Sequence, residues 1–218
     1  MTSRTDRTTA PFTVGFDLDM TLIDSRPGIH ACYLELSART GTYIDADLTI
    51  TRLGPPLEEE LRHWFPADRV AAMATLYREM YPTYAITATP ALPGAREAVD
   101  AVHAAGGRAL VVTAKFEPNA KLHMEHLAID VDAVIGDLWA EQKAQALTEH
   151  GASVYVGDHT GDVRGARTAG ALSVAVATGP CDAAELRAAG ADVVLDDLTR
   201  FPAWLAAYRA DGSVADLA

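Results

Sequence analysis

Lysine is scarce in this chain of 218 residues: only Lys115, Lys121 and Lys143 occur, and none lies between residues 26 and 91. Lysine and arginine together number 18 against 30 acidic residues, which gives a net charge of −12. This balance argues against nucleic acid and against an anionic membrane surface as the main partner, because both reward a basic patch. A small phosphorylated metabolite stays open as the partner, since a metal ion and local charge can outweigh the overall sign.

The small number of cysteines and the lack of long apolar runs indicate the compartment in which the protein acts. The chain has only two cysteines, Cys32 and Cys181, which lie far apart and in no metal-ligand spacing, so we expect free thiols in a reducing compartment. No apolar run approaches the ~20 residues of a membrane span, and no apolar signal segment follows the polar start. We therefore expect a cytoplasmic monomer or homodimer with no membrane partner, and flexible tails at residues 1–10 and 211–218.

The hydrophobic pattern predicts an α/β fold. A first apolar strand is expected at residues 12–18, and from residue 92 onward helices alternate with short apolar strands, which are expected at 108–113, 133–135, 153–156, 172–177 and 193–195. Strands that alternate with helices imply right-handed crossovers and a parallel sheet covered on both faces. Residues 11–25 and 92–210 are therefore expected to form one parallel-sheet core.

Residues 26–91 have a different character, with helical spacing and no convincing strand. Apolar residues recur at this spacing around residues 29–36, 57–65 and 70–80, with breaks at Gly41 and at residues 54–56 and an end at Pro82. A segment of this length is too long for a crossover between neighbouring strands. We therefore expect an inserted, all-helical second domain.

Polar side chains follow several of the predicted strands at the point where each strand ends. They are Asp17, Asp19 and Thr21 after the first strand, Thr113 and Lys115 after the second, and Asp158 and Asp162 after the strand at 153–156, which is entered from a helix bearing Lys143. Ligands of parallel sheets bind beyond the carboxyl ends of the strands, so we expect these residues to meet. Carboxylates there can hold a hard cation such as Mg²⁺, while a hydroxyl and a lysine hold phosphate oxygens. One carboxylate can attack phosphorus, and another can pass a proton to the leaving oxygen.

Four short motifs resemble those of the haloacid dehalogenase superfamily, in its phosphoglycolate-phosphatase-like branch. They are Asp17-Leu18-Asp19-Met20-Thr21 for D-x-D-x-T, Val111-Val112-Thr113 for an apolar run ending in Thr or Ser, Lys143 for a lone lysine, and residues 157–162 for G-D-x-x-x-D. The resemblance covers about residues 12–200. It implies a Rossmann-like parallel sheet core with an inserted all-helical cap domain at residues 26–91.

The resemblance also implies an activity and a set of roles. The activity is Mg²⁺-dependent hydrolysis of a small phosphomonoester, phosphoglycolate-like or another phosphometabolite, through an aspartyl-phosphate. Asp17 would be the nucleophile and a metal ligand, and Asp19 would be the general acid and base and a metal ligand through its backbone carbonyl. The phosphate ligands would be Thr113, the Ala114 N–H and Lys143. The further metal ligands would be Asp158 and Asp162. Arg52 and Lys115 are the candidate specificity residues, and Lys115 competes with Lys143 for the phosphate.

Some alternatives stay open and others do not. A sugar phosphomutase of the same superfamily and a catalytically silent phosphate-binding member share these core residues. A dehalogenase would need neither Mg²⁺ nor the second acid, and a phosphonate hydrolase would need a cap lysine, which is absent. Met20 replaces the glycine most often found in the first motif, and glycine permits unusual backbone angles. Met20 therefore indicates a locally different turn or a sulfur that lines the pocket, and the motif still works if this position can stay in an ordinary backbone region.

Overall fold

The computed structural model describes residues 12–212 and residue 214, so the expected tail at 1–10 and much of that at 211–218 lie outside the described residues. Within this part of the chain, six strands form one sheet: β1 (Thr13–Phe16), β2 (Arg108–Val112), β3 (Ala133–Ile135), β4 (Ala152–Gly157), β5 (Leu172–Val176) and β6 (Val193–Leu195). All pairings are parallel, and the strand order is β3-β2-β1-β4-β5-β6. The predicted α/β class is confirmed. Because β1 pairs with both β2 and β4, its carboxyl end lies beside two other strand ends that carry polar residues.

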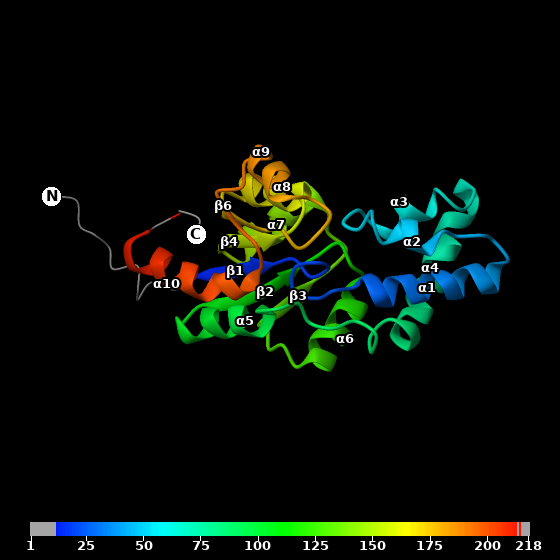
Figure 1. Cartoon of the computed structure of the whole chain (residues 1–218), viewed down its shortest axis with the longest axis horizontal. Helices are drawn as coiled ribbons and strands as arrows, with labels where there is room; N and C mark the ends of the chain where they lie inside the picture. Colours follow the sequence, from blue (N-terminus) through cyan, green and yellow to red (C-terminus); the bar gives the residue numbers. More distant parts are fainter. Residues whose placement is uncertain (1–11, 213, 215–218) are drawn as a thin grey trace.

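Helices cover both faces of this sheet (Figure 1). They are α5 (Ala95–Ala104), α6 (Glu117–Leu127), α7 (Lys143–Glu149), α8 (Thr160–Ala169), α9 (Ala183–Ala188) and α10 (Phe201–Asp211), with 3₁₀ turns at Ala140–Gln142 and Leu198–Arg200. Helices α5, α6 and α10 pack with Val14 and Phe16 on one face, and α7 and α8 pack with Leu110 and Tyr155 on the other. The central strands are therefore buried on both sides, which is why they appear in the sequence as nearly continuous apolar runs.

The chain between β1 and α5 forms a helical block beyond one end of the sheet (Figure 1). Its helices are α1 (Arg26–Thr40), α2 (Ala46–Thr49), α3 (Leu57–Leu61) and α4 (Ala67–Tyr84), and they enclose a separate apolar cluster around Leu36, Leu61 and Tyr81. The two connections of the block run side by side, since Ile23 bridges to Ala91 and the Asp24 N–H donates to the Pro90 carbonyl at 2.9 Å. That this block acts as a cap domain with boundaries at 26 and 91 stays a prediction.

Details of the predicted helices in this block are wrong. Helix α4 does not end at Pro82 but continues to Tyr84. Pro82 lies in its last turn, where little helix remains to be disrupted by the missing N–H. The second predicted helix was to reach residue 65, but α3 ends at Leu61. Phe65 precedes Pro66, and the residue before a proline avoids the helical region. The one-turn helix α2 was not expected; the Asp45 carboxylate caps it by accepting the Leu48 N–H at 2.9 Å.

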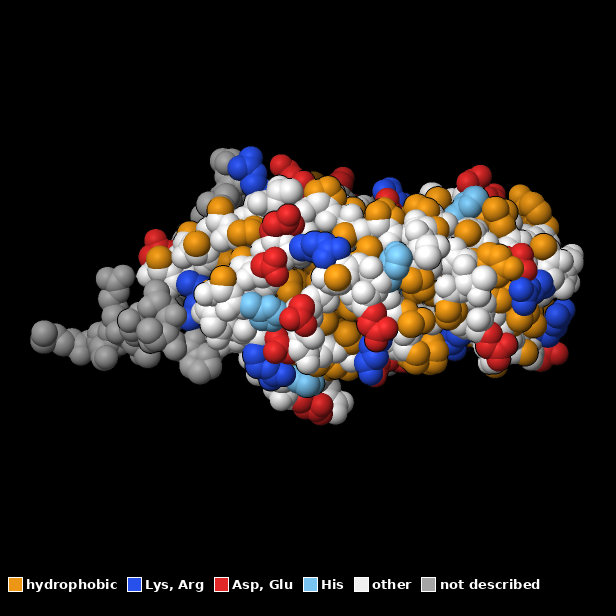
Figure 2. Space-filling view, turned by 90° about the horizontal axis from the view of Figure 1, so that it is seen from below, with side chains coloured by type: hydrophobic (Ala, Val, Ile, Leu, Met, Phe, Trp, Pro, Cys, Tyr) orange, Lys and Arg blue, Asp and Glu red, His pale blue; other side chains and the backbone are white. Residues whose placement is uncertain are grey.

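The surface carries charged side chains of both signs. Figure 2 shows acidic and basic side chains interspersed over one face, without a broad basic field. Among the described residues, no helix combines the length and the apolar character that crossing a membrane requires. Cys32 and Cys181 are free thiols, the first buried and the second partly exposed, as predicted.

Candidate active site

The chain turns sharply where β1 ends. The Asp17 N–H still donates to the Val156 carbonyl of β4 at 2.8 Å, so Asp17 is held against the neighbouring strand. Directly after it the Leu18 carbonyl accepts the Leu22 N–H at 2.9 Å, and the Met20 N–H donates to the Ile23 carbonyl at 2.8 Å. This compact turn separates the surroundings of Asp17 from those of Asp19.

Met20 lies at the tip of that turn with a φ of 60°, in the left-handed region. Met20 thus does not stay in an ordinary backbone region: the turn keeps the geometry that a glycine favours, at a cost of about 1–2 kcal/mol for a larger residue. The Met20 side chain is buried, and its carbonyl accepts the Thr178 hydroxyl at 2.6 Å. It lines a small recess with Ile50 and Leu53 of the helical block. Burial and this hydrogen bond offset the strain.

Three of the predicted acids gather into one buried cluster. Asp17, Asp158 and Asp162 each place a carboxylate oxygen within 4.8 Å of the others. Asp158 follows β4 and accepts the Thr21 hydroxyl at 2.7 Å, while Asp162 lies in the first turn of α8. Gly179 faces Asp158, and any Cβ there would overlap the Asp158 carboxylate. The carboxyl end of β4, the first motif and the loop at Gly179 therefore combine to shape this cluster.

Lys143 is the cation that contacts this cluster. Its Nζ atom lies 2.6 Å from Asp162 Oδ1, 3.0 Å from Asp17 Oδ1 and 2.8 Å from the Tyr155 hydroxyl, and the side chain is 0% exposed. Tyr155 in turn donates to the Val112 carbonyl at 2.7 Å, which fixes the hydroxyl that Lys143 contacts. Sequence reasoning missed Tyr155, because a tyrosine in the middle of an apolar strand is indistinguishable from a core residue.

The cluster carries more negative charge than Lys143 can neutralise. Burial, and next to it the repulsion of Asp162, raises the pKa of Asp17 to about 7 in spite of Lys143. Burial and the same neighbouring acids raise the pKa of Asp158 well above its usual range. Asp17 Oδ1 is buried, and its ion-pair contact at 3.0 Å is with Lys143. Buried oxygen donors with unbalanced negative charge are suited to a hard divalent cation, so Asp17, Asp158 and Asp162 fit a metal site.

Asp19 points away from that cluster and pairs with the other candidate lysine. Lys115 Nζ lies 2.8 Å from Asp19 Oδ1 and 3.1 Å from Oδ2, and it sits 4.7 Å from the centre of the Tyr81 ring. Burial alone would raise the pKa of Asp19, but the Lys115 ammonium outweighs it and lowers that pKa. Of the four predicted metal ligands, the structure thus brings together three side chains, and Asp19 could contribute only its backbone. Lys143, not Lys115, lies against Asp17.

The predicted phosphate ligands lie at the neighbouring strand end. Thr113 follows β2 and is buried, and its hydroxyl accepts the Lys115 N–H at 3.2 Å. In the part of the chain that the structure describes, the backbone N–H groups of Asp19 and Ala114 donate to no acceptor. These N–H groups and the Thr113 hydroxyl are therefore available to the oxygens of an anion.

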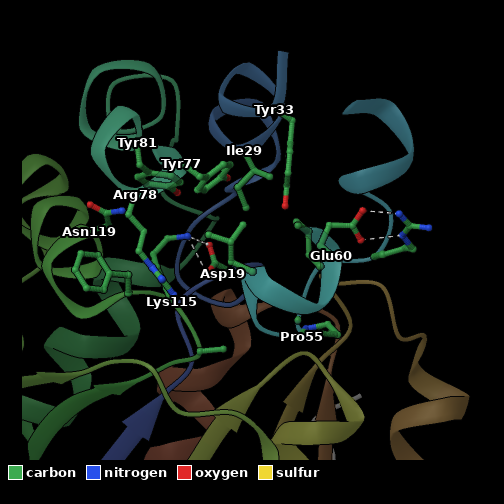
Figure 3. A pocket seen from close by; sticks show the side chains of 16 residues that line it. Asp19, Ile29, Tyr33, Pro55, Glu60, Tyr77, Arg78, Tyr81, Lys115 and Asn119 are labelled. Carbon is green, nitrogen blue, oxygen red and sulfur yellow. Dashed lines mark hydrogen bonds and ion pairs between the residues drawn. The ribbon is translucent and has the colours of Figure 1, made fainter. Parts of the chain in front are cut away.

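A cavity of about 100 Å³ opens between Asp19 and the helical block (Figure 3). Lys115, Phe116 and Asn119 line it from the sheet side, and tyrosines of α1 and α4 line it from the block. Arg52 also reaches the cavity, as predicted for a specificity residue. Its guanidinium is held by Glu60, with Nε and Nη2 at 3.0 and 2.5 Å from the two carboxylate oxygens. The Glu60 contact could not be foreseen from the sequence.

A parallel sheet with an acid cluster, a lysine and a threonine at its carboxyl edge defines a class of phosphate-handling enzymes. The model for haloacid dehalogenase-like hydrolases matches residues 14–167, and the chain belongs to this family. The family resemblance inferred from the four motifs is confirmed.

Individual relatives agree with this assignment. The chain is 32% identical over 184 residues to a phosphoglycolate phosphatase of Xylella fastidiosa, covering 75% of this chain and 79% of that protein. It is 29% identical over 184 residues to the tyrosine-protein kinase PtkA of Mycobacterium tuberculosis, covering 78% of this chain but only 63% of PtkA, less than two thirds of its length. The solved structure of the haloacid dehalogenase-like hydrolase SP0104 of Streptococcus pneumoniae is similar at 25% identity, with a TM-score of 0.76 over 90% of this chain and 97% of that one.

Proposed function

We propose that this protein is a Mg²⁺-dependent phosphatase that hydrolyses a small phosphomonoester through an aspartyl-phosphate. The observation that carries the proposal is the buried Asp17 carboxylate, which contacts Lys143 and clusters with the acids Asp158 and Asp162, while Asp19 pairs with Lys115 instead. The relationship to the phosphatase of Xylella fastidiosa supports it. A cytoplasmic location and a monomeric or homodimeric state stay predictions.

The acid cluster would hold the metal ion. Asp17, Asp158 and Asp162 would be its side-chain ligands and the Asp19 carbonyl a further one, and the ion would supply positive charge that neutralises the phosphoryl oxygens. The Thr113 hydroxyl, the Ala114 N–H and Lys143 bind the same oxygens from the protein. Their shared task is to hold the phosphorus in front of Asp17.

The proposed reaction has two steps. An Asp17 oxygen attacks phosphorus, the bond from phosphorus to the leaving oxygen breaks, and Asp19 gives that oxygen a proton. Water next attacks the phosphorus of the aspartyl-phosphate, Asp19 takes a proton from the water, and the bond to Asp17 breaks. The products are an alcohol and inorganic phosphate, and both aspartates return to their starting state.

Lys115 bears on the first of these steps. In the structure it keeps Asp19 ionised, the form that takes a proton from water in the second step. To act as an acid, Asp19 must be released from Lys115 and protonated. The cavity that borders both residues is where the leaving group enters, so substrate binding and this release occur in one place.

Asp17→Asn tests the mechanism, with the exposed Asp130→Asn as control, since both variants remove one negative charge. Turnover of a panel of phosphorylated metabolites with Mg²⁺ should disappear in Asp17→Asn and persist in Asp130→Asn. EDTA should abolish turnover in the wild type and in Asp130→Asn. Wild-type turnover in Asp17→Asn, or full activity in EDTA, would overturn the proposal. Isomerisation of a sugar phosphate without phosphate release would identify a phosphomutase, and no turnover of any ester would identify a silent member.

A further inference from the structure

We infer that the leaving group of the substrate is uncharged and apolar, on the scale of a single ring, and not a second anion such as the carboxylate of phosphoglycolate. This inference rests on the proposed function, because it takes the cavity beside Asp19 as the place of the leaving group. It names the substrate class that the helical block selects.

The position of the cavity assigns it to the leaving group. It borders Asp19, the proposed proton donor, and Ala114, whose N–H is a proposed phosphate ligand, while Asp17 does not line it. A group bonded to phosphorus on the side opposite Asp17 would therefore extend into this space. Its volume of about 100 Å³ is below the ~150 Å³ of a cavity known to accept benzene, but the space is open at one side, so a ring can enter it in part.

The cations in the cavity wall are each neutralised by an acid of the protein. Lys115 pairs with Asp19 at 2.8 Å. Arg52 pairs with Glu60 at 2.5 Å, and Arg78 pairs with Glu58 at 2.8 Å. A substrate carboxylate that drew Arg52 or Arg78 away from its acid would leave a partly buried protein carboxylate without its partner. An anionic leaving group is thus disfavoured at Arg52 and Arg78, whereas an uncharged one leaves both of these pairs intact.

Four aromatic rings line much of the remaining wall, together with the apolar Ile29, Leu53, Pro55 and Leu57 and the uncharged amide of Asn119. The rings of Tyr33 and Tyr77 lie 5.0 Å apart, those of Tyr77 and Tyr81 lie 5.8 Å apart, and Phe116 closes the cavity from the sheet side. Figure 3 shows the three tyrosines on the side of the helical block, above Lys115 and Asp19. Among the described residues, the buried Tyr33 and Tyr77 side chains make no hydrogen bond through their hydroxyls. Such a wall suits a flat apolar group that carries at most uncharged hydrogen-bonding atoms.

A matched pair of substrates tests this inference. Benzyl phosphate and phosphoglycolate both release a primary alkoxide, so their kcat/KM ratio with Mg²⁺ reports mainly on the rest of the leaving group. We expect benzyl phosphate to be preferred by at least about tenfold, the scale on which apolar pockets discriminate. Equal values, or a preference for phosphoglycolate, would overturn the inference.

One variant tests the charge argument directly. Glu60→Gln removes the partner of Arg52 while keeping its shape, so the kcat/KM ratio should move toward phosphoglycolate by about tenfold or more. Glu59→Gln is the control, since Glu59 is exposed on the same helix and does not line the cavity. An unchanged ratio in Glu60→Gln, or an equal shift in Glu59→Gln, would contradict the argument.

Failure of the proposed function can be told apart from failure of this inference. If no ester is turned over, p-nitrophenyl phosphate included, the proposed function fails. Calorimetric binding of the isosteric phosphonates 2-phenylethylphosphonate and 3-phosphonopropionate, with Mg²⁺ present, then still compares a ring with a carboxylate. Tighter binding of the phenyl compound supports the inference, and equal or weaker binding overturns it.

Discussion

Replacement of Lys143 by methionine tests the electrostatic account of the site most directly. Lys143 is 0% exposed and contacts two carboxylates, Asp17 and Asp162, at 3.0 and 2.6 Å. Methionine has a similar length and fills the same space without the charge, so the variant removes the ammonium and little packing. Lys121→Met is the matched control, because Lys121 is 53% exposed and pairs with Glu117 one helical turn away.

The expected magnitudes differ widely between the two variants. Removing one partner of a buried ion pair costs about 3–5 kcal/mol, since the remaining charge is left uncompensated. An exposed pair within one helix contributes about 0.3–0.5 kcal/mol. In EDTA at pH 7, the free energy of unfolding should therefore fall by about 3 kcal/mol or more in Lys143→Met and by less than about 0.5 kcal/mol in Lys121→Met.

Urea unfolding followed by circular dichroism measures both values. The loss in Lys143→Met should shrink at pH 5, because carboxyl groups freed from the lysine can be neutralised by protonation at that pH. Mg²⁺ should restore part of it at pH 7, since an ion that binds only the folded state stabilises that state. If Lys143→Met and Lys121→Met lose the same stability in EDTA, the acids are not held by Lys143 and the reasoning is refuted.

Three further predictions concern residues of the same site. Without metal, the free energy of unfolding should fall as the pH rises from about 4 to about 7. The pKa of Asp17 is raised from 3.8 to about 7 in the folded protein, so Asp17 keeps a proton there that the unfolded chain has lost. Urea titrations should show this fall, and saturating Mg²⁺ should remove it. Tyr155→Phe should cost about 1–2 kcal/mol and lower kcat several-fold, because Lys143 and the Val112 carbonyl lose a shared partner; unchanged stability and kcat would contradict this. Met20→Gly should relieve about 1–2 kcal/mol of backbone strain but lose about 1.5–3 kcal/mol of side-chain burial. The free energy of unfolding, measured by thermal unfolding, should therefore fall by about 1 kcal/mol, and a variant more stable than the wild type would show that strain outweighs burial.

The fold and most of the site residues could be predicted because each depends on a local pattern. A strand covered on both faces must be apolar along its length, so β1, β2 and β4 stand out in the sequence. Parallel strands then bring their carboxyl ends to one edge, which is why Asp17, Thr113 and Asp158 could be expected to meet before any coordinates were known.

The features that sequence reasoning missed depend on contacts between distant side chains. Tyr155 becomes a site residue only because it lies beside Lys143 in space. Arg52 reaches the cavity as predicted, but its charge is cancelled by Glu60, and no local pattern shows that pairing. The left-handed Met20 is of the same kind, since its strain is tolerated through burial against the helical block and a hydrogen bond from Thr178.

The turn at Met20 explains how two identical side chains two residues apart come to differ. In a continuing strand Asp17 and Asp19 would point to the same side, and both carboxylates would face Asp158. Because β1 ends at Phe16 and the chain turns at Met20, Asp19 faces Lys115 instead. The pKa of Asp17 is consequently raised to about 7 and that of Asp19 is lowered. Surroundings that drive the pKa values of two carboxyl groups apart give the two groups different chemical roles, so the strained turn is part of the proposed mechanism.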